Sequence, residues 1–206
     1  MQALLTVGST EFTPLVSAAL HNDFLTRLVN KGYSHFYVQA GKSCLPHGWA
    51  LDTPQILLES LTVKIVDYTP DIEERMLDTN LVICHAGKSL PLDIFTCSPL
   101  KPCMEGAGSV LAALRGPPIS SPDARKTKRP FIIVVPNDTL MDNHQSQLSR
   151  ELVKQNLAYS STSQLQDLLL VLDQLGSNAL NTQKPLEKPN TFVDLVDQLM
   201  GYSKVS

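Results

Sequence analysis

The sequence predicts an α/β protein built on a doubly wound parallel sheet. Apolar runs alternate along the chain with helical patterns, which is the order of elements in such sheets. The clearest run, FIIVV at residues 131–135, is apolar at every position, as a strand covered on both faces requires. The crossovers between parallel strands are therefore expected to be right-handed and to place helices on both faces.

Each element follows from a local pattern. Strands are expected at residues 3–7, 35–40, 62–68, 81–84 and 131–135, where apolar runs are followed by turn residues. Helices are expected at residues 13–32, 71–77, 107–114 and 143–155; Thr13 before Pro14 is a helix start signal. Amphipathic helices at 165–175 and 192–200 close the chain. These two helices are expected to pack on the sheet, with docking on a partner as the alternative.

Composition limits the function. The chain has 206 residues, 43% hydrophobic, with a net charge of −3, which indicates one globular domain of residues 1–160 and a carboxy-terminal helical extension of residues 161–206. The only basic run, at residues 125–129, is interpreted as a solvated loop, so no nucleic-acid partner is expected. No secretory leader and no membrane-spanning stretch are predicted. The four cysteines, Cys44, Cys84, Cys97 and Cys103, lack paired metal spacing and are expected to be reduced.

Three loops at the carboxyl ends of the strands are candidate binding sites, because ligands of parallel sheets gather at that edge. The first holds Gly8, Ser9 and Thr10, where the glycine allows close backbone approach and the hydroxyls can donate. A tight turn made of small residues would have the same composition, so both interpretations stay open.

The second loop begins at His85 and Gly87 and ends in a GAGS helix start at Gly106, Gly108 and Ser109, which would present amides to a phosphate. Neither a GxGxxG motif nor a P-loop is present, so a dinucleotide enzyme or a kinase is not predicted. Metal ligation is not predicted either.

The third loop, residues 137–145 (NDTLMDNHQ), collects groups that both donate and accept hydrogen bonds. Asp142 could simply cap the following helix. Asn143, His144 and Gln145 remain, and hydroxyl-rich ligands such as sugars are bound by such groups. We therefore favour a binding role for this loop.

These segments also carry a family resemblance. The stretches LLTVGSTEFTPLV, DIEERMLDTNLVICHAG, AGSVLAALR and LMDNHQSQLSRELVKQN resemble the small catalytic subunit of the two-part UDP-N-acetylglucosamine transferase of asparagine-linked glycosylation, over most of residues 3–157. The resemblance implies a Rossmann-like fold, the sugar-nucleotide-binding half of a GT-B glycosyltransferase. The other half is expected on a membrane-anchored second subunit.

The resemblance also implies roles for the candidate residues. Gly106, Gly108 and Ser109 would face the UDP diphosphate, and the loop with Asn143, His144 and Gln145 would lie near the N-acetylglucosamine. Gly8, with its neighbours Ser9 and Thr10, would lie in the cleft that faces the other half. His85, Gly87 and Asp142 are further candidates.

The implied reaction is the inverting transfer of N-acetylglucosamine from UDP to dolichyl-diphosphate-N-acetylglucosamine, at the cytosolic face of the endoplasmic reticulum. No cofactor is expected, because amides and helix dipoles can stabilise the departing UDP. A general base must still deprotonate the acceptor hydroxyl. The sequence offers no convincing base, so the partner is a possible source.

Two features depart from the family pattern. The family's HAGAGS motif is divided here by residues 88–106, and residues 116–129 form a second expanded loop. Ala112 stands where the family helix usually carries an acidic residue for the ribose hydroxyls. The alternative to an active subunit is therefore a non-catalytic module of the same fold that binds a partner but has lost its sugar nucleotide. A stand-alone nucleotide-sugar enzyme is the third, less favoured interpretation.

Overall fold

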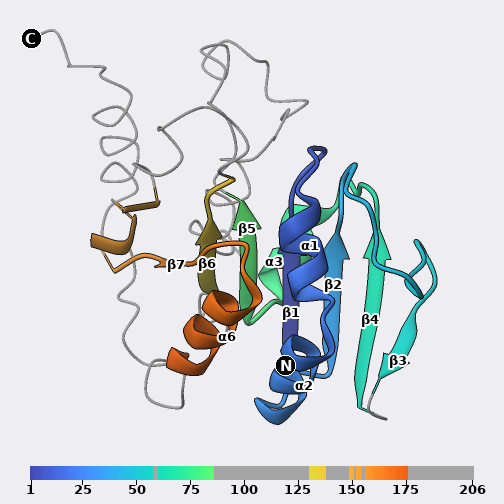
Figure 1. Ribbon diagram of the computed structural model, residues 1–206, viewed down its shortest axis with the longest axis horizontal. Helices are drawn as coiled ribbons and strands as arrows, with labels where there is room; N and C mark the ends of the chain where they lie inside the picture. Colours follow the sequence, from blue (N-terminus) through green and yellow to red (C-terminus); the bar gives the residue numbers. More distant parts are fainter. Residues whose placement is uncertain (58–59, 86–129, 138–148, 151, 155, 176–206) are drawn as a thin grey trace, which may run out of the picture.

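The chain forms a central sheet with helices on both faces (Figure 1). The computed structural model describes residues 1–57, 60–85, 130–137, 149–150, 152–154 and 156–175. The expected helices at 107–114 and 192–200, and most of the one at 143–155, lie outside these residues. Residues 149–150 and 152–154, from the last of these, are helical.

Seven strands make up the sheet, in the order β3-β4-β2-β1-β5-β6-β7. They are β1 Gln2–Thr6, β2 His35–Gln39, β3 Gln55–Leu57, β4 Leu61–Val66, β5 Leu81–His85, β6 Phe131–Val135 and β7 Tyr159–Ser160. All neighbours pair in parallel except β3, which runs antiparallel to β4 at the edge. The predicted doubly wound α/β fold is confirmed, with the correction that the sheet is mixed.

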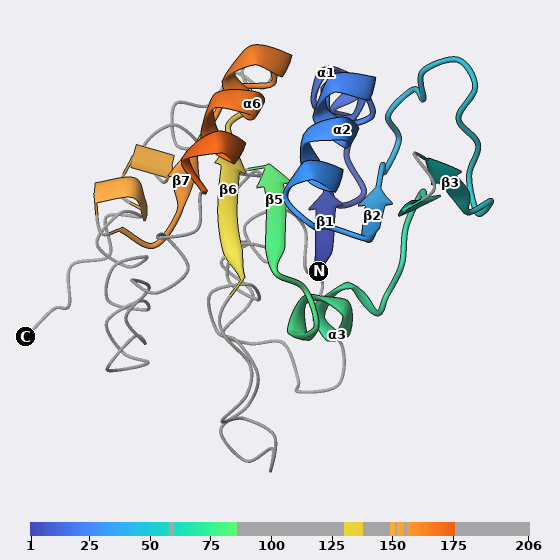
Figure 2. The ribbon, with the colours of Figure 1, turned by 90° about the horizontal axis from the view of Figure 1, so that it is seen from below.

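Helices cover the sheet on both sides, as the apolar strands require. The helices are α1 Thr13–Ala19, α2 Asn22–Asn30, α3 Ile72–Leu77 and α6 Leu165–Gln174. α1, α2 and α6 lie on one face and α3 on the other (Figure 2). Because side chains of a strand alternate between faces, Leu5 of β1 packs with the first group of helices, while its neighbour Leu4 packs with Met76 of α3.

The single helix expected over residues 13–32 is wrong. α1 ends at Ala19, and α2 begins after His21, whose ring accepts a hydrogen bond from the Asp23 amide at 3.2 Å. His21 is extended, with φ −71° and ψ 141°, so its side chain caps α2 in place of a continuing helical turn. The break lets two short helices cover the sheet at different angles in Figure 1.

α6 belongs to the core of the sheet, as expected for the first closing helix. Leu168 and Leu172 are fully buried with residues of α1 and α2. The exposed Arg27 of α2 also binds Asp173 of α6, with Nη1 at 2.7 Å from both carboxylate oxygens. A separate extension at residues 161–206 stays a prediction, because residues 176–206 lie outside the described part.

The strand order creates one switch point. From β1 the chain proceeds outward through β2 to β4 on one side, and then through β5, β6 and β7 on the other. The carboxyl ends of β1 and β5 are therefore neighbours at the point where the strand order reverses. Ligands of open α/β sheets bind at this point, outside the carboxyl ends of the strands.

Candidate functional site

The loop after β1 lies at the switch point of the sheet. Gly8 has a positive φ of +65°, a conformation that glycine adopts without the steric cost of a Cβ atom. Two residues later, the Thr10 hydroxyl donates to the Val7 carbonyl oxygen at 2.7 Å. Gly8 is buried, while Ser9 and Thr10 are half-buried. The hydroxyl proton of Thr10 is thus used within the loop itself.

Two buried side chains hold Gly8 in place. The Gly8 amide donates to Thr6 Oγ1 at 3.1 Å, and Gln39 Nε2 donates to the Gly8 carbonyl at 3.3 Å. Thr6 Oγ1 in turn donates to Gln39 Oε1 at 3.3 Å. Thr6 and Gln39 are each 1% exposed. This closed network satisfies the buried backbone groups of the turn and couples β1 to β2.

Gly41, just after β2, packs directly against this loop. Its φ is +55°, and an added Cβ would lie 2.2 Å from the Thr10 carbonyl oxygen and 2.8 Å from that of Gly8. The next amide, of Lys42, donates to the same Thr10 oxygen at 3.0 Å. Only glycine therefore allows the β2 loop to approach the β1 loop this closely.

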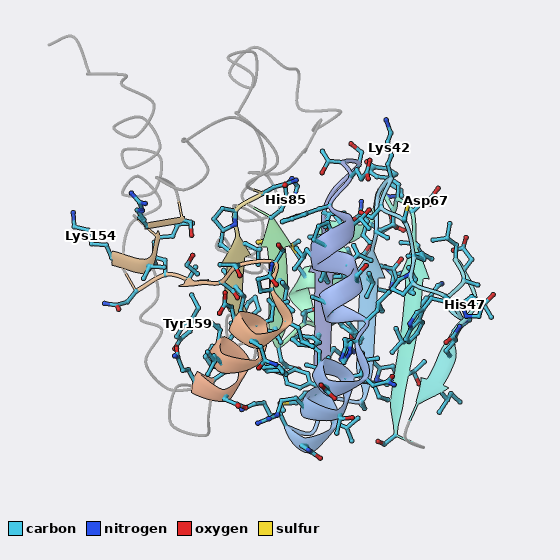
Figure 3. All side chains as sticks on the ribbon, viewed as in Figure 1. Lys42, His47, Asp67, His85, Lys154 and Tyr159 are labelled. Carbon is cyan, nitrogen blue, oxygen red and sulfur yellow. The ribbon has the colours of Figure 1, made fainter. Side chains whose placement is uncertain are left out.

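His85 ends β5 on the other side of the switch point. It shares a sheet face with Leu81 and Ile83, and its Nε2 lies 3.4 Å from Thr10 Oγ1. Figure 3 shows the ring at the carboxyl end of the sheet, the edge at which Lys42 and Asp67 also lie. Burial lowers the pKa of His85 to about 4, and the backbone of Thr6 acts weakly in the opposite direction. The imidazole is therefore neutral at physiological pH.

Asn137 brings the start of the third loop to the same place. It follows β6, is 2% exposed, and its Nδ2 donates to the Glu11 carbonyl oxygen at 3.4 Å. Thr10 and Glu11 of the β1 loop thus touch the residues that begin the other two candidate loops. Hydroxyl, imidazole and amide groups meet here, and this set of uncharged groups suits a polar, hydroxyl-bearing ligand.

The structure brings together only part of the predicted site. Gly8, Ser9, Thr10 and His85 are described, and Thr10 and His85 are in contact. The other candidates lie outside the described residues: Gly87, Gly106, Gly108, Ser109, Asp142, Asn143, His144 and Gln145. Their proposed roles stay predictions, as does the effect of Ala112.

Known proteins resemble this chain in sequence. Residues 2–95 match the glycosyltransferase family 28 C-terminal domain. The UDP-N-acetylglucosamine transferase subunit ALG13 of Mus musculus is 30% identical over 190 residues. The protein of that name from Cryptococcus neoformans (strain JEC21) is 28% identical over 226 residues. The chain therefore resembles these subunits and, over residues 2–95, the family 28 C-terminal domain.

The overlap differs between these relatives. The alignment covers 89% of this chain but only 13% of the mouse protein, so the chain spans a small part of that relative. With the fungal protein it covers 97% of this chain and 96% of the relative. An NMR solution structure of ALG13 covers 94% of this chain and 93% of its own, with a TM-score of 0.58 and 22% identity. That likeness supports the fold alone.

Among the described residues, no group of three His, Cys, Asp or Glu side chains could hold a metal ion. None of the described helices is long and apolar enough to cross a membrane. Cys44 and Cys84 are free thiols, and burial raises the pKa of Cys84 to about 12. Cys97 and Cys103 lie outside the described residues.

Sequence reasoning missed the residues that hold the β1 loop. Thr6, Gln39 and Gly41 lie next to the candidate glycine in space, but Gln39 is 31 residues away from Gly8 in sequence. One signal was present: Thr6 and Gln39 are polar residues at the ends of strands predicted to be buried on both faces. A buried polar side chain needs a hydrogen-bonding partner, so these positions indicate a network at the carboxyl edge.

Proposed function

We propose that this chain is the sugar-nucleotide-binding subunit of an N-acetylglucosaminyltransferase. It would move N-acetylglucosamine from UDP to dolichyl-diphosphate-N-acetylglucosamine, the second sugar step of lipid-linked oligosaccharide assembly. One observation carries the proposal: at the β1/β5 switch point, the loop after β1 contacts His85, the last residue of β5, and Asn137, which follows β6. Relatives named as UDP-N-acetylglucosamine transferase subunits supply the substrate class.

The proposed binding mode follows from where the loops start. His85 leads into the loop that ends at Gly106, Gly108 and Ser109, whose amides and hydroxyl suit the diphosphate. Asn137 leads into the loop with Asn143 and Gln145, whose amides suit the hexosamine. Both loops start beside Thr10 and Glu11, which supports one shared ligand for the two loops.

The proposed chemistry is an inverting displacement. The acceptor hydroxyl oxygen forms a bond to the anomeric carbon, the bond from that carbon to the UDP oxygen breaks, and the hydroxyl proton passes to a general base. Amide N–H groups at a helix start stabilise the charge that develops on the departing diphosphate. The partner is the proposed source of the base, because the sequence of this chain offers no convincing one.

The proposed partner is a membrane-anchored subunit that carries the acceptor-binding half of a GT-B enzyme. The fungal and mouse relatives are themselves named subunits. Activity would then arise at the cytosolic face of the endoplasmic reticulum, where the partner holds this chain beside its lipid-linked acceptor. Neither half alone would complete the cleft.

The test is a titration of UDP-N-acetylglucosamine into the full chain, with and without the membrane subunit. It is followed by an assay of transfer to the lipid-diphosphate-sugar acceptor. Turnover only in the mixture is the expected result. His85→Gln and Asn143→Ala should reduce turnover at least about tenfold, since each removes a hydrogen bond to the bound substrate.

A matched control is His47→Gln, an exposed histidine beside β3 and far from the site in Figure 3. It should leave turnover unchanged. Two sequence features, the interrupted glycine motif and Ala112, favour the alternative of a non-catalytic module. Complex formation without sugar-nucleotide binding or turnover would establish that alternative and reject the enzyme subunit.

A further inference from the structure

The contact between Thr10 and His85 joins the two sides of the switch point. Thr10 Oγ1 lies 2.7 Å from the Val7 carbonyl oxygen and 3.4 Å from His85 Nε2. Thr10 is half-buried, and His85 is 1% exposed. The direction of each hydrogen bond depends on which of its two atoms carries the hydrogen.

The Val7 carbonyl has no proton to offer, so a 2.7 Å separation from a hydroxyl oxygen requires the Thr10 proton between them. The Thr10 oxygen then has only lone pairs left for His85. Nε2 must therefore carry the hydrogen in the 3.4 Å contact. Because the pKa of His85 is lowered to about 4, the neutral ring has a single N–H at physiological pH. Nδ1 is left as an unprotonated acceptor.

That acceptor is buried and lacks a hydrogen bond. Nδ1 has less than 1 Å² of exposed surface and no hydrogen-bond partner among the described residues. A buried polar atom without a partner is destabilising, because it has lost its hydrogen bonds to water. Such a cost at a ligand-binding edge indicates a group that is completed when the ligand arrives.

We propose that Thr10 holds His85 as the Nε2–H tautomer, so that Nδ1 accepts a hydrogen bond from a hydroxyl or N–H group of the bound sugar nucleotide. This inference rests on the proposed function. It also specifies which part of the ligand faces His85. An ionised diphosphate offers only acceptor oxygens, so it is not the expected partner of Nδ1 in the neutral ring. Thr10 is a positioning residue that acts through His85.

The opposite tautomer is the competing arrangement. The Thr6 backbone acts as a hydrogen-bond partner of the ring and raises the pKa of His85, although no bond to Nδ1 has normal hydrogen-bond geometry. A proton on Nδ1 could be donated toward that backbone, and Nε2 would then be the unprotonated nitrogen. The two tautomers differ in which ring nitrogen carries hydrogen, and nitrogen chemical shifts distinguish them directly.

The first experiment needs no ligand. The ring nitrogens of the five histidines are observed by ¹⁵N NMR in the full chain, and His85 is assigned from the signals lost in His85→Gln. The wild type should show a protonated Nε2. Thr10→Val should change the tautomer ratio, since it removes the accepting oxygen, and Thr10→Ser should restore it. A protonated Nδ1 in the wild type, or a ratio indifferent to Thr10→Val, would overturn the proposal.

The second experiment adds UDP or UDP-N-acetylglucosamine to the chain in complex with its membrane subunit, with binding followed by calorimetry. A shift of the His85 Nδ1 signal toward its hydrogen-bonded value supports the ligand role. If UDP suffices, the donating group belongs to the nucleoside; if the sugar is required, it belongs to the hexosamine. Binding with no Nδ1 shift would overturn that role. An absence of binding would reject the proposed function with it, while the ligand-free tautomer still decides the part played by Thr10.

Discussion

The two ends of the parallel sheet use the same residue types in opposite ways. The amino end exposes Gln2, His35 and Asn80, whereas the carboxyl end buries Gln39, His85 and Asn137 at 1%, 1% and 2% exposure. At the amino end the polar groups close the sheet: the Gln2 amide donates to Asn80 Oδ1 at 2.9 Å, and the Asn80 amide donates to the Gln2 carbonyl at 2.9 Å. Water can replace these bonds at little cost.

At the carboxyl end, water cannot replace the hydrogen bonds in this way, because the polar side chains are buried. Gln39 and Thr6 hold the Gly8 turn away from solvent, and His85 keeps a ring nitrogen unsatisfied among the described residues. Burying polar groups is unfavourable unless they are paired. Of these side chains, His85 bears this cost, and it lies at the edge where we propose that the ligand binds. Matched substitutions at the two ends test this difference.

The largest contrast is expected for the glycines that flank β2. Gly41→Ala would place a Cβ 2.2 Å from the Thr10 carbonyl oxygen, whereas Gly32→Ala, also at positive φ, would meet only Met1 Cε at 3.7 Å. Gly41→Ala should lower the free energy of unfolding by about 3 kcal/mol or more and displace the β1 loop. Gly32→Ala should cost about 1–2 kcal/mol from backbone strain alone.

Chemical denaturation of both variants measures this contrast. Titration of UDP-N-acetylglucosamine should show that Gly41→Ala also loses ligand affinity while Gly32→Ala keeps it. Equal losses of stability in the two variants would remove the special status of the carboxyl end. If Gly41→Ala fails to fold, a thermal-shift comparison of the two variants in crude lysate still ranks the two sites.

A pH titration is expected to give the next largest effect. The pKa of His85 falls from 6.5 to about 4 on burial, so the unfolded chain takes up a proton at higher pH than the folded chain does. Stability from this group is therefore complete above pH 6.5 and is lost as pH falls toward 4. The loss over that interval is about 3 kcal/mol.

The variant His85→Gln should lack this part of the pH dependence. Urea denaturation of wild type and variant from pH 7 to pH 4 measures the difference, and other titrating groups cancel in the comparison. His35→Gln, at the exposed end of β2, is the matched control. Parallel stability curves for wild type and His85→Gln would mean that His85 is protonated as easily in the folded protein as in the unfolded chain.

Replacement of the buried Gln39 should change the free energy of unfolding less than the Gly41 substitution or the protonation of His85. Gln39→Leu leaves the Gly8 carbonyl and the Thr6 hydroxyl without their partner, which should cost about 1–3 kcal/mol. Gln2→Leu, on the exposed end of β1, should change stability by no more than about 0.5 kcal/mol. Equilibrium denaturation with both variants decides; a Gln2→Leu loss as large as that of Gln39→Leu would contradict the comparison.

Much of the fold could be predicted because its signals are local. Residues 131–135 were predicted as a strand from five consecutive apolar residues, and β6 has those bounds. β3 and β7 were not predicted, because they have three and two residues. Such short segments do not show the alternation of apolar and polar residues that marks a strand. The break between α1 and α2 was missed because it depends on one side-chain cap at His21.

The site was less accessible to sequence reasoning. That the carboxyl ends of β1 and β5 should lie side by side follows from the geometry of parallel sheets, and Thr10, after β1, does contact His85 at the end of β5. The hydrogen bonds that hold the β1 loop could not be predicted from sheet geometry, because Thr6 and Gln39 are 33 residues apart in sequence. Which ring nitrogen of His85 carries the hydrogen depends on the Val7 carbonyl, the Thr10 hydroxyl and the burial of the ring. These three come together only in the folded chain.

The smallest effect is expected where two charges meet in solvent. Arg27 and Asp173 join α2 to α6 through one nitrogen, Nη1, which contacts both carboxylate oxygens, and each side chain is 43% exposed. A double-mutant cycle of Arg27→Ala and Asp173→Ala should give a coupling free energy of about 0.2–1 kcal/mol, because water screens the pair and ordering two long side chains opposes it. The coupling should shrink further in 1 M salt. A coupling above the loss from Gln39→Leu would show that an exposed charge pair stabilises this protein more than the buried network does. The amino and carboxyl ends of the sheet would then no longer explain where its polar groups matter.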